Sequence, residues 1–358
     1  MYSKEEQTLI WLSSFDLPYK KQEQLMQTVG LVDLIDKIDC KKVREILDKD
    51  FERVLKDASK EFLNSYLNAL EEQKVVCLTI ESKNYPEKLR VIENPPFVIF
   101  AKGNLSFFND RAVGIVGTRM PSNYGRLITE KFATELAGAG LVIVSGLAFG
   151  VDSISHSSAM KAKGKTIAVI GSGFNYLYPD GNRALADEIS EKGLLISEYR
   201  PSMRAQRFTF PQRNRIIAAL SEGILITEAG EKSGALHTKN YALDYGKEVF
   251  VVPGNINSAK SAGTNNVIRS MQGSCVLDPN DILERLGIKF GAKTKKVVQL
   301  SINEEMITNA LKDGETTLEE LTEKTKLSIN NIVSCLTMLE IRGIIKKLPG
   351  NTYIKNDF

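Results

Sequence analysis

Three short apolar runs, each ending in glycine, decide the fold of this chain: RAVGIVG at 111–117, LVIVSG at 141–146 and TIAVIGSG at 166–173. The runs are rich in β-branched residues, and helical apolar periodicity follows each of them, as in SNYGRLITEKFATELAGAG at 122–140. Fully apolar strands that alternate with helices are typical of a parallel sheet covered on both faces. The sequence therefore predicts an α/β fold with a Rossmann-like parallel sheet and right-handed crossovers.

The same alternation continues on both sides of these runs and extends the predicted sheet domain to residues 73–288. We expect further strands in LLISEY (194–199), GILITEA (223–229), EVFVVPG (248–254) and SCVLD (274–278). Helices are expected over 182–193, from near 210, from near 233 and over 279–287. VVCLTI (75–80) and the proline-broken segment 84–104 form the entry to the domain.

Residues 1–72 predict a small helical, SAM-like domain, because apolar residues recur there at helical spacing and no strand pattern is present. The expected helical segments are LIWLSSF (9–15), VGLVDLIDKI (29–38), VREILDKDFERVL (43–55) and KEFLNSYLNALEE (60–72). The stretch LMQTVGLVDLI (25–35) lacks the Gly-x-Gly amides of a hairpin that grips DNA, so a plain helix connection is the favoured interpretation.

A basic, polar segment at 289–300 predicts a linker, and residues 301–358 predict three helices and a hairpin, which is a winged-helix domain. The third helix carries no lysine or arginine before Arg342, and its Ile332, Leu336 and Leu339 fit a core face. This pattern favours a structural or protein-interaction role over reading of the major groove.

Composition excludes several classes of protein. The 358 residues carry a net charge of only +3, so a nucleic-acid site must come from local clustering of charge. The four cysteines lack Cys-x-x-Cys or Cys/His spacing, which argues against a zinc site or disulfide framework and favours a reducing cytoplasm. The first residues are a poor signal peptide, and no apolar run is long enough for a membrane span. We expect no metal and no cofactor.

The stretch YRPSMRAQRFTFPQRNRIIAALS (199–221) contains five arginines and no acid, and lies between two expected strands. Arginine forks bind phosphate, aromatic faces accept unstacked bases, and a helix start points amide N–H groups at anions. A solvated arginine loop beside two core phenylalanines explains the composition equally well. The stretch alone leaves both interpretations open.

Small residues follow the strands at the edge where ligands bind in open parallel sheets. The loops in question are VGTR, VSGLAFGVD, IGSGF, TEAGEKSGALHT and VPGN. Glycine lets the backbone approach a ligand, and several such loops at one edge predict a nucleotide or polyanion site. The residues singled out in them are Gly117, Thr118, Arg119, Ser145, Gly146, Gly171, Ser172, Gly173, Phe174, Ser233 and Gly234.

Two more specific phosphate-binding motifs are incomplete in this chain. The GSG at 171–173 has Tyr176 where a dinucleotide fingerprint needs its third glycine, and a Walker-like AMKAKGKT has Ala159 in place of its first glycine and precedes a strand. Lys163 then remains as a basic residue expected near the same edge. Both histidines, His156 and His237, are expected to be structural, and Asp152 is expected to cap a helix or order a loop.

The motifs SGLAFGVD, GSGFNYLYP, SEYRP, FPQRNRIIAALS, TEAGEKSGALHT and VFVVPGNINSAKSAGTNNVI occur here in one order over about 80–287. In this set the chain resembles the DNA-processing protein A family, also called DprA or Smf. The resemblance implies an extended Rossmann fold that dimerises through its core. It also implies a cytoplasmic, non-catalytic protein that binds single-stranded DNA during natural transformation and loads the RecA recombinase on it.

Carried over residue by residue, the resemblance implies a DNA pocket that includes Arg119, Ser145, Gly146 and the GSGF loop, with Phe174 stacking a base. It adds phosphate contacts from the basic stretch, namely Arg204, Arg207, Asn214 and Arg215, and weaker transfers at Lys163 and Lys239. Phe208 and Phe210 are assigned to packing. His237 stands where relatives have an apolar residue, and its role is left open.

Two rival functions remain. The glycine loops are also similar to those of phosphoribohydrolases that cleave nucleoside monophosphates, but Asn240 follows the SGALHT turn and no glutamate stands at the catalytic spacing. A regulator that binds double-stranded DNA through the winged helix is the other alternative, and it predicts loss of binding when residues 292–358 are removed.

Overall fold

The computed structural model describes residues 2–288, 300–312, 314–348 and 350–355. The chain forms two compact units, residues 1–289 and residues 290–358. The expected linker at 289–300 lies outside the described residues, apart from Leu300. No helix within the described ranges is both long and apolar enough to cross a membrane.

The first unit contains a nine-stranded sheet in the order β1-β2-β6-β5-β4-β3-β7-β8-β9. The strands from β6 to β9 along this order are parallel, and β1 and β2 add antiparallel pairs at one edge. The predicted Rossmann-like sheet is therefore confirmed. The strand bounds are β1 Val76–Thr79, β2 Val98–Gly103, β3 Ala112–Val116, β4 Val142–Ser145, β5 Thr166–Ile170, β6 Leu194–Ser197, β7 Gly223–Ile226, β8 Glu248–Val251 and β9 Ser274–Cys275.

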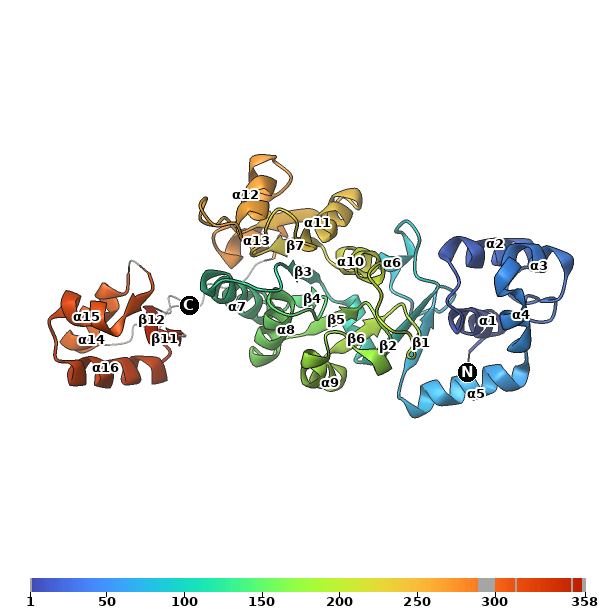
Figure 1. Ribbon diagram of the computed structural model, residues 1–358, viewed down its shortest axis with the longest axis horizontal. Coiled ribbons are helices and arrows are strands. Elements are labelled where there is room, and N and C mark those ends of the chain that lie inside the picture. The colour runs from blue at the N-terminus through green and yellow to red at the C-terminus, as the bar shows by residue number, and fades with distance from the viewer. Residues whose placement is uncertain (1, 289–299, 313, 349, 356–358) are drawn as a thin grey trace. The chain divides into compact units, whose positions relative to one another are not determined.

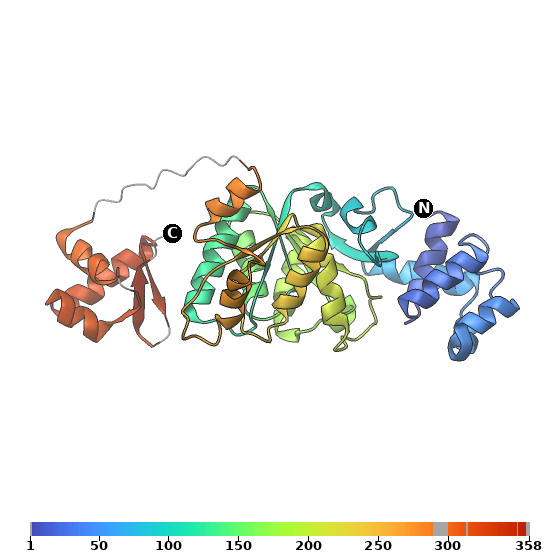
Figure 2. The same cartoon turned by 90° about the horizontal axis from the view of Figure 1, so that it is seen from above.

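Helices cover both faces of the sheet because the central strands are apolar on both sides. Helices α7, α8 and α9 lie on one face and α10, α11 and α12 on the other (Figure 1). Figure 2 views the sheet from the side of α10 and α11. The bounds are α6 Glu87–Arg90, α7 Asn123–Gly138, α8 Val151–Lys161, α9 Arg183–Lys192, α10 Thr209–Leu220, α11 Ala235–Asp244, α12 Ala262–Arg269 and α13 Pro279–Arg285.

Strand β3 marks the topological switch point of the sheet. It pairs with β4 on one side and with β7 on the other. The chain leaves β3 towards β4 and leaves β7 towards β8, so the loops after β3 and β7 diverge. A crevice at such a point, outside the carboxyl ends of the strands, is the usual ligand site of an open α/β sheet.

The N-terminal residues form helices, as the sequence predicts, around buried Trp11, Leu25, Leu34 and Leu47. The predicted helix at 29–38 is wrong: the chain runs through successive turns at 31–39, because α2 ends at Gly30 with a positive φ of 83°. The helix α2 was not expected. The bounds are α1 Lys4–Ser13, α2 Tyr19–Val29, α3 Lys41–Leu47, α4 Phe51–Lys56 and α5 Lys60–Glu72.

These helices pack onto the antiparallel edge of the sheet. Tyr19 stacks on Phe97 with ring centroids 4.5 Å apart, and Leu9 and Ile10 share a core cluster with strand residues such as Phe100. The packing of 1–72 against the sheet explains why residues 1–289 form one compact unit.

The second unit has the helices and strands of a winged-helix domain, as predicted. Ile332, Leu336 and Leu339 of its third helix are buried, in agreement with the assigned core face. Its three strands pair in the order β10-β12-β11. The bounds are α14 Ile302–Ala310, α15 Leu318–Thr325, α16 Ile329–Ile341, β10 Thr316–Thr317, β11 Ile345–Leu348 and β12 Thr352–Lys355.

Candidate nucleic-acid interface

A cavity of about 920 Å³ opens at the switch point between the loops that follow β3 and β7. The loop 198–208 and the first turns of α10 complete its wall. The structure brings these predicted residues together in its lining: Gly117, Thr118, Arg119, Arg207, Asn214, Ser233 and Gly234. The size of the cavity suits a ligand of a few nucleotides or smaller.

The lining is electropositive. Arg119, Arg207 and Lys232 are exposed cations in it, and α11 begins beside them with Gly234 at its N-cap. Asp152 is the only acid in the lining, as far as the described residues go. Its burial raises the pKa of the Asp152 carboxyl, and the nearby charge of Arg213 acts in the opposite direction. Cations that lie beside a helix N-terminus form a site for anions.

Two aromatic rings also line the cavity. The Tyr178 and Phe210 ring centroids are 5.5 Å apart, and the guanidinium of Arg119 lies 5.8 Å from the Phe210 ring centre. Tyr178 is 51% exposed, and Phe210 is half-buried. The assignment of Phe210 to packing is thus incomplete, and Phe208, which is 51% exposed, is not a core residue either.

Ser145 and Gly146 lie beneath the cavity and do not line it. The buried Ser145 hydroxyl donates to the carbonyl of Ile115 at 2.6 Å. The buried Arg213 guanidinium donates to the carbonyls of Gly146 and Val169, and a Cβ at Gly146 would overlap it. The glycine here makes room for the buried Arg213, and Gly146 itself does not line the cavity.

The GSGF loop is covered by the segment 200–203. The Gly173 N–H donates to the Met203 carbonyl at 2.8 Å, and a Cβ on Gly173 would lie 2.1 Å from the carbonyl oxygen of Arg200. Gly171 and the buried Ser172 are likewise not in the cavity lining. Phe174 is only 5% exposed and belongs to a core cluster, so its face is not available to a base. The glycines serve close packing of two chain segments.

The remaining arginines of the basic stretch separate into two environments. Arg204 is exposed and lies over the Tyr176 ring at 4.5 Å, in the loop that leads to Arg207 but outside the cavity lining. Arg215 is only 8% exposed and pairs with Glu198 at 2.5 Å. In this structure the guanidinium of Arg215 is thus held by a carboxylate, and Arg215 does not line the cavity.

Both predicted lysines lie away from the cavity. Lys163 is exposed in the turn between α8 and β5, which is the amino end of the strand and the opposite edge of the sheet. The error arose because α8 carries the chain back across the sheet before Lys163 is reached. Lys239 is buried on α11, where its Nζ donates to Gln272 Oε1 at 2.5 Å.

The two histidines differ. His156 is fully buried, with its Nδ1 2.6 Å from the Thr166 hydroxyl, as expected of a structural residue. Burial, assisted by the charge of Arg213, lowers its pKa to about 3. His237 is exposed in the cavity lining, and with Lys232 it extends the site beyond the predicted residues. Lys232 lies in the loop after β7 and His237 in the first turn of α11, which follows that loop. This place in the chain was the signal available in the sequence.

Comparison with protein families gives two matches. The model of DNA recombination-mediator protein A matches residues 76–287, and the model of the DprA winged helix domain matches residues 292–351. DNA processing protein DprA of Bacillus subtilis is 43% identical over 222 residues, which cover 62% of this chain and 74% of that protein. Protein Smf of Escherichia coli is 33% identical over 301 residues, which cover 80% of this chain and 79% of that protein.

Two solved structures are similar at 31% sequence identity. The crystal structure of DNA processing protein A from Streptococcus pneumoniae has a TM-score of 0.67 and covers 81% of this chain and 100% of that chain. DNA processing protein A from Helicobacter pylori, whose structure concerns its mode of binding single-stranded DNA, has a TM-score of 0.55 and covers 60% of this chain and 95% of that chain.

Proposed function

The chain belongs to the DNA recombination-mediator protein A family, and on that premise we propose that it binds single-stranded DNA without regard to base sequence. The observation that carries the proposal is the electropositive cavity at the switch point. The reported binding of single-stranded DNA by the Helicobacter pylori relative supports the choice of ligand.

The chemistry of the cavity fits an unpaired strand. Arg119, Arg207 and Lys232 are suited to phosphate oxygens, which every nucleotide presents. Phe210 and Tyr178 offer ring faces, and only unpaired bases have free faces to stack on them, for about 1–3 kcal/mol per base. Preference for single strands over duplex follows from this combination.

We propose a binding function without catalysis. The phosphoribohydrolase alternative requires a catalytic glutamate, whereas Asn240 follows the corresponding turn and Asp152 is the only acid among the described lining residues. Incubation with AMP should release no free base. Turnover that disappears in Asp152→Asn would support the enzyme instead.

The family resemblance also supports delivery of the bound strand to RecA and a homodimer formed through the Rossmann-like domain. For the dimer surface, the segment 266–271 stays a candidate, because Met271 at its end is 93% exposed. The GILITEA segment is no longer a candidate for the dimer surface, because β7 is an interior strand between β3 and β8. Sedimentation of Met271→Glu tests this surface: a monomer is expected, and an unchanged dimer would contradict it.

The test of the proposed function is fluorescence anisotropy with a labelled single strand and a hairpin duplex at several salt concentrations. The wild type should bind the single strand more tightly. Arg119→Gln should weaken binding and reduce the slope of log affinity against log salt by about 0.7, the value for one phosphate contact with a single strand. Lys163→Gln is the matched control at the opposite edge. Equal binding by the wild type and Arg119→Gln would refute the site.

A further inference from the structure

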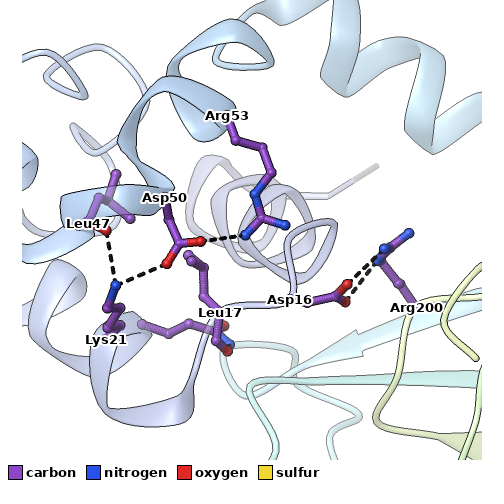
Figure 3. Close-up of polar contacts among 8 residues, drawn as sticks. Asp16, Leu17, Lys21, Leu47, Asp50, Arg53 and Arg200 are labelled. Carbon is purple, nitrogen blue, oxygen red and sulfur yellow. Dashed lines mark hydrogen bonds and ion pairs between the residues drawn. The ribbon is translucent and has the colours of Figure 1, made fainter. Parts of the chain in front are cut away.

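An ion pair joins the N-terminal helical region to the arginine loop, the segment 198–208 that contains Arg200, Arg204 and Arg207. Arg200 donates from Nε to Asp16 Oδ1 at 3.1 Å and from its terminal nitrogen to Asp16 Oδ2 at 3.0 Å (Figure 3). The two parallel contacts form the fork geometry that gives arginine–carboxylate pairs their directional strength. The Asp16 bond raises the pKa of Arg200, and burial acts in the opposite direction.

Asp16 is presented by a rigid part of the helical region. Its neighbours Phe15 and Leu17 are both 6% exposed and belong to the N-terminal core. The Phe15 ring packs edge-on against Trp11 with centroids 5.1 Å apart. The carboxylate therefore projects from a segment that is held in place on both sides.

Arg200 lies at the start of the loop that carries the exposed arginines of the candidate site. Its carbonyl accepts from the Met203 N–H at 2.9 Å and closes a turn. The same turn is bonded to the GSGF loop, through Gly173 N–H to Met203 at 2.8 Å and Asn175 N–H to Pro201 at 3.0 Å. Restraint at Arg200 is thus passed directly to the chain that leads to Arg204 and Arg207.

We propose that Asp16 is a positioning residue for nucleic-acid binding: the helical region holds Arg200 and thereby keeps the loop 200–207 in its binding conformation. The proposal rests on the proposed function of the cavity. It assigns Arg200 to loop ordering, because its fork is already occupied by a carboxylate. A loop that is ordered before binding loses less conformational freedom when the strand arrives.

The expected effect is modest, because both side chains are partly exposed, Arg200 at 26% and Asp16 at 40%. Asp16→Asn should weaken binding of a labelled single strand about two- to fivefold. The salt slope should stay as in the wild type, because no phosphate contact is removed. The exchanged pair Asp16→Arg with Arg200→Asp should restore most of the affinity.

Lys21→Gln is the matched control. Lys21 belongs to the same helical region, where it bonds Asp50 at 3.0 Å and the Leu47 carbonyl at 3.0 Å, but it has no described bond to the arginine loop (Figure 3). It should lower stability without changing affinity. If Asp16→Asn binds as the wild type does, or more tightly, or if the exchanged pair folds and restores nothing, the inference is overturned.

Hydrogen exchange separates this inference from the proposed function. In Asp16→Asn, the amides of 203–207 should exchange faster than in the wild type or in Lys21→Gln, whether or not DNA is bound. Unchanged exchange there refutes the positioning role. A wild type that binds no single strand refutes the proposed function instead, and the exchange result then stands by itself.

Discussion

The most discriminating prediction makes one substitution, arginine to glutamine, at two positions of the same stretch. Arg207 is an exposed cation of the cavity lining. Arg215 is 8% exposed and bonded to Glu198 at 2.5 Å. The two residues are equivalent in composition, but the structure predicts a role in binding for Arg207 and a role in stability for Arg215.

For Arg215→Gln we expect a loss of stability. Removing one partner of a buried ion pair costs about 3–5 kcal/mol, and the lower end applies because Glu198 keeps a 20% exposed side chain. For a unit of this size, a loss of about 1 kcal/mol lowers the midpoint of thermal unfolding by about 2–4 °C. A loss of about 3 kcal/mol should therefore lower that midpoint by about 6–12 °C. Affinity of the folded fraction for a single strand should change little.

For Arg207→Gln we expect nearly unchanged stability and weaker binding of the single strand. An exposed substitution of this kind changes stability by no more than about 0.5 kcal/mol. Loss of one phosphate contact reduces the salt slope by about 0.7. Over a fourfold rise in salt, the wild type should therefore lose about 2.5-fold more affinity than the variant.

Circular dichroism during heating measures the stability of each variant, and anisotropy at 50, 100 and 200 mM salt measures the salt slope of its affinity. A stable Arg215→Gln with a reduced salt slope would make Arg215 a phosphate ligand after all, and the argument from burial would fail. An unchanged slope in Arg207→Gln would remove the cavity from the DNA path.

Three further predictions follow from buried or lining residues. Burial lowers the pKa of His156 to about 3, so below about pH 6.5 the unfolded chain binds more protons than the folded chain and stability falls as the pH falls. Between pH 7.0 and 5.5, the free energy of unfolding in urea should drop by about 1.2 kcal/mol more in the wild type than in His156→Gln. An equal drop in both proteins would contradict the burial of His156. Phe210→Leu should weaken single-strand binding about fivefold, as measured by anisotropy. Phe174→Leu should lower the free energy of unfolding in urea by about 1 kcal/mol and leave the affinity unchanged. If Phe174→Leu lost affinity and Phe210→Leu did not, the stacking role would belong to Phe174. Gly173→Ala should destabilise the chain by about 1–3 kcal/mol in urea unfolding, since its Cβ meets the Arg200 carbonyl, and wild-type stability would contradict this contact.

The fold could be predicted because its signal is periodic and local. Apolar strands and amphipathic helices alternate over 111–287, and a parallel sheet is the arrangement that buries both faces of such strands. The edge that carries the site could be predicted for the same reason, since successive strands of a parallel sheet end on one side. Gly30 shows the limit: its effect on the 29–38 segment depended on a backbone conformation that the apolar pattern does not encode.

The sequence by itself determined the sheet, the winged helix and the edge at which Arg119, Arg207 and Asn214 meet. Only the tertiary structure decided which neighbouring residues face the cavity. Consecutive helical residues point about 100° apart. The buried Arg213 therefore borders the cavity while it donates to the Val169 carbonyl, the less buried Asn214 lines the cavity, and Arg215 lies outside the lining and pairs with Glu198. A glycine is equally ambiguous in sequence, because it permits close approach of a ligand or of another chain segment, and at Gly173 the neighbour is the backbone of Arg200.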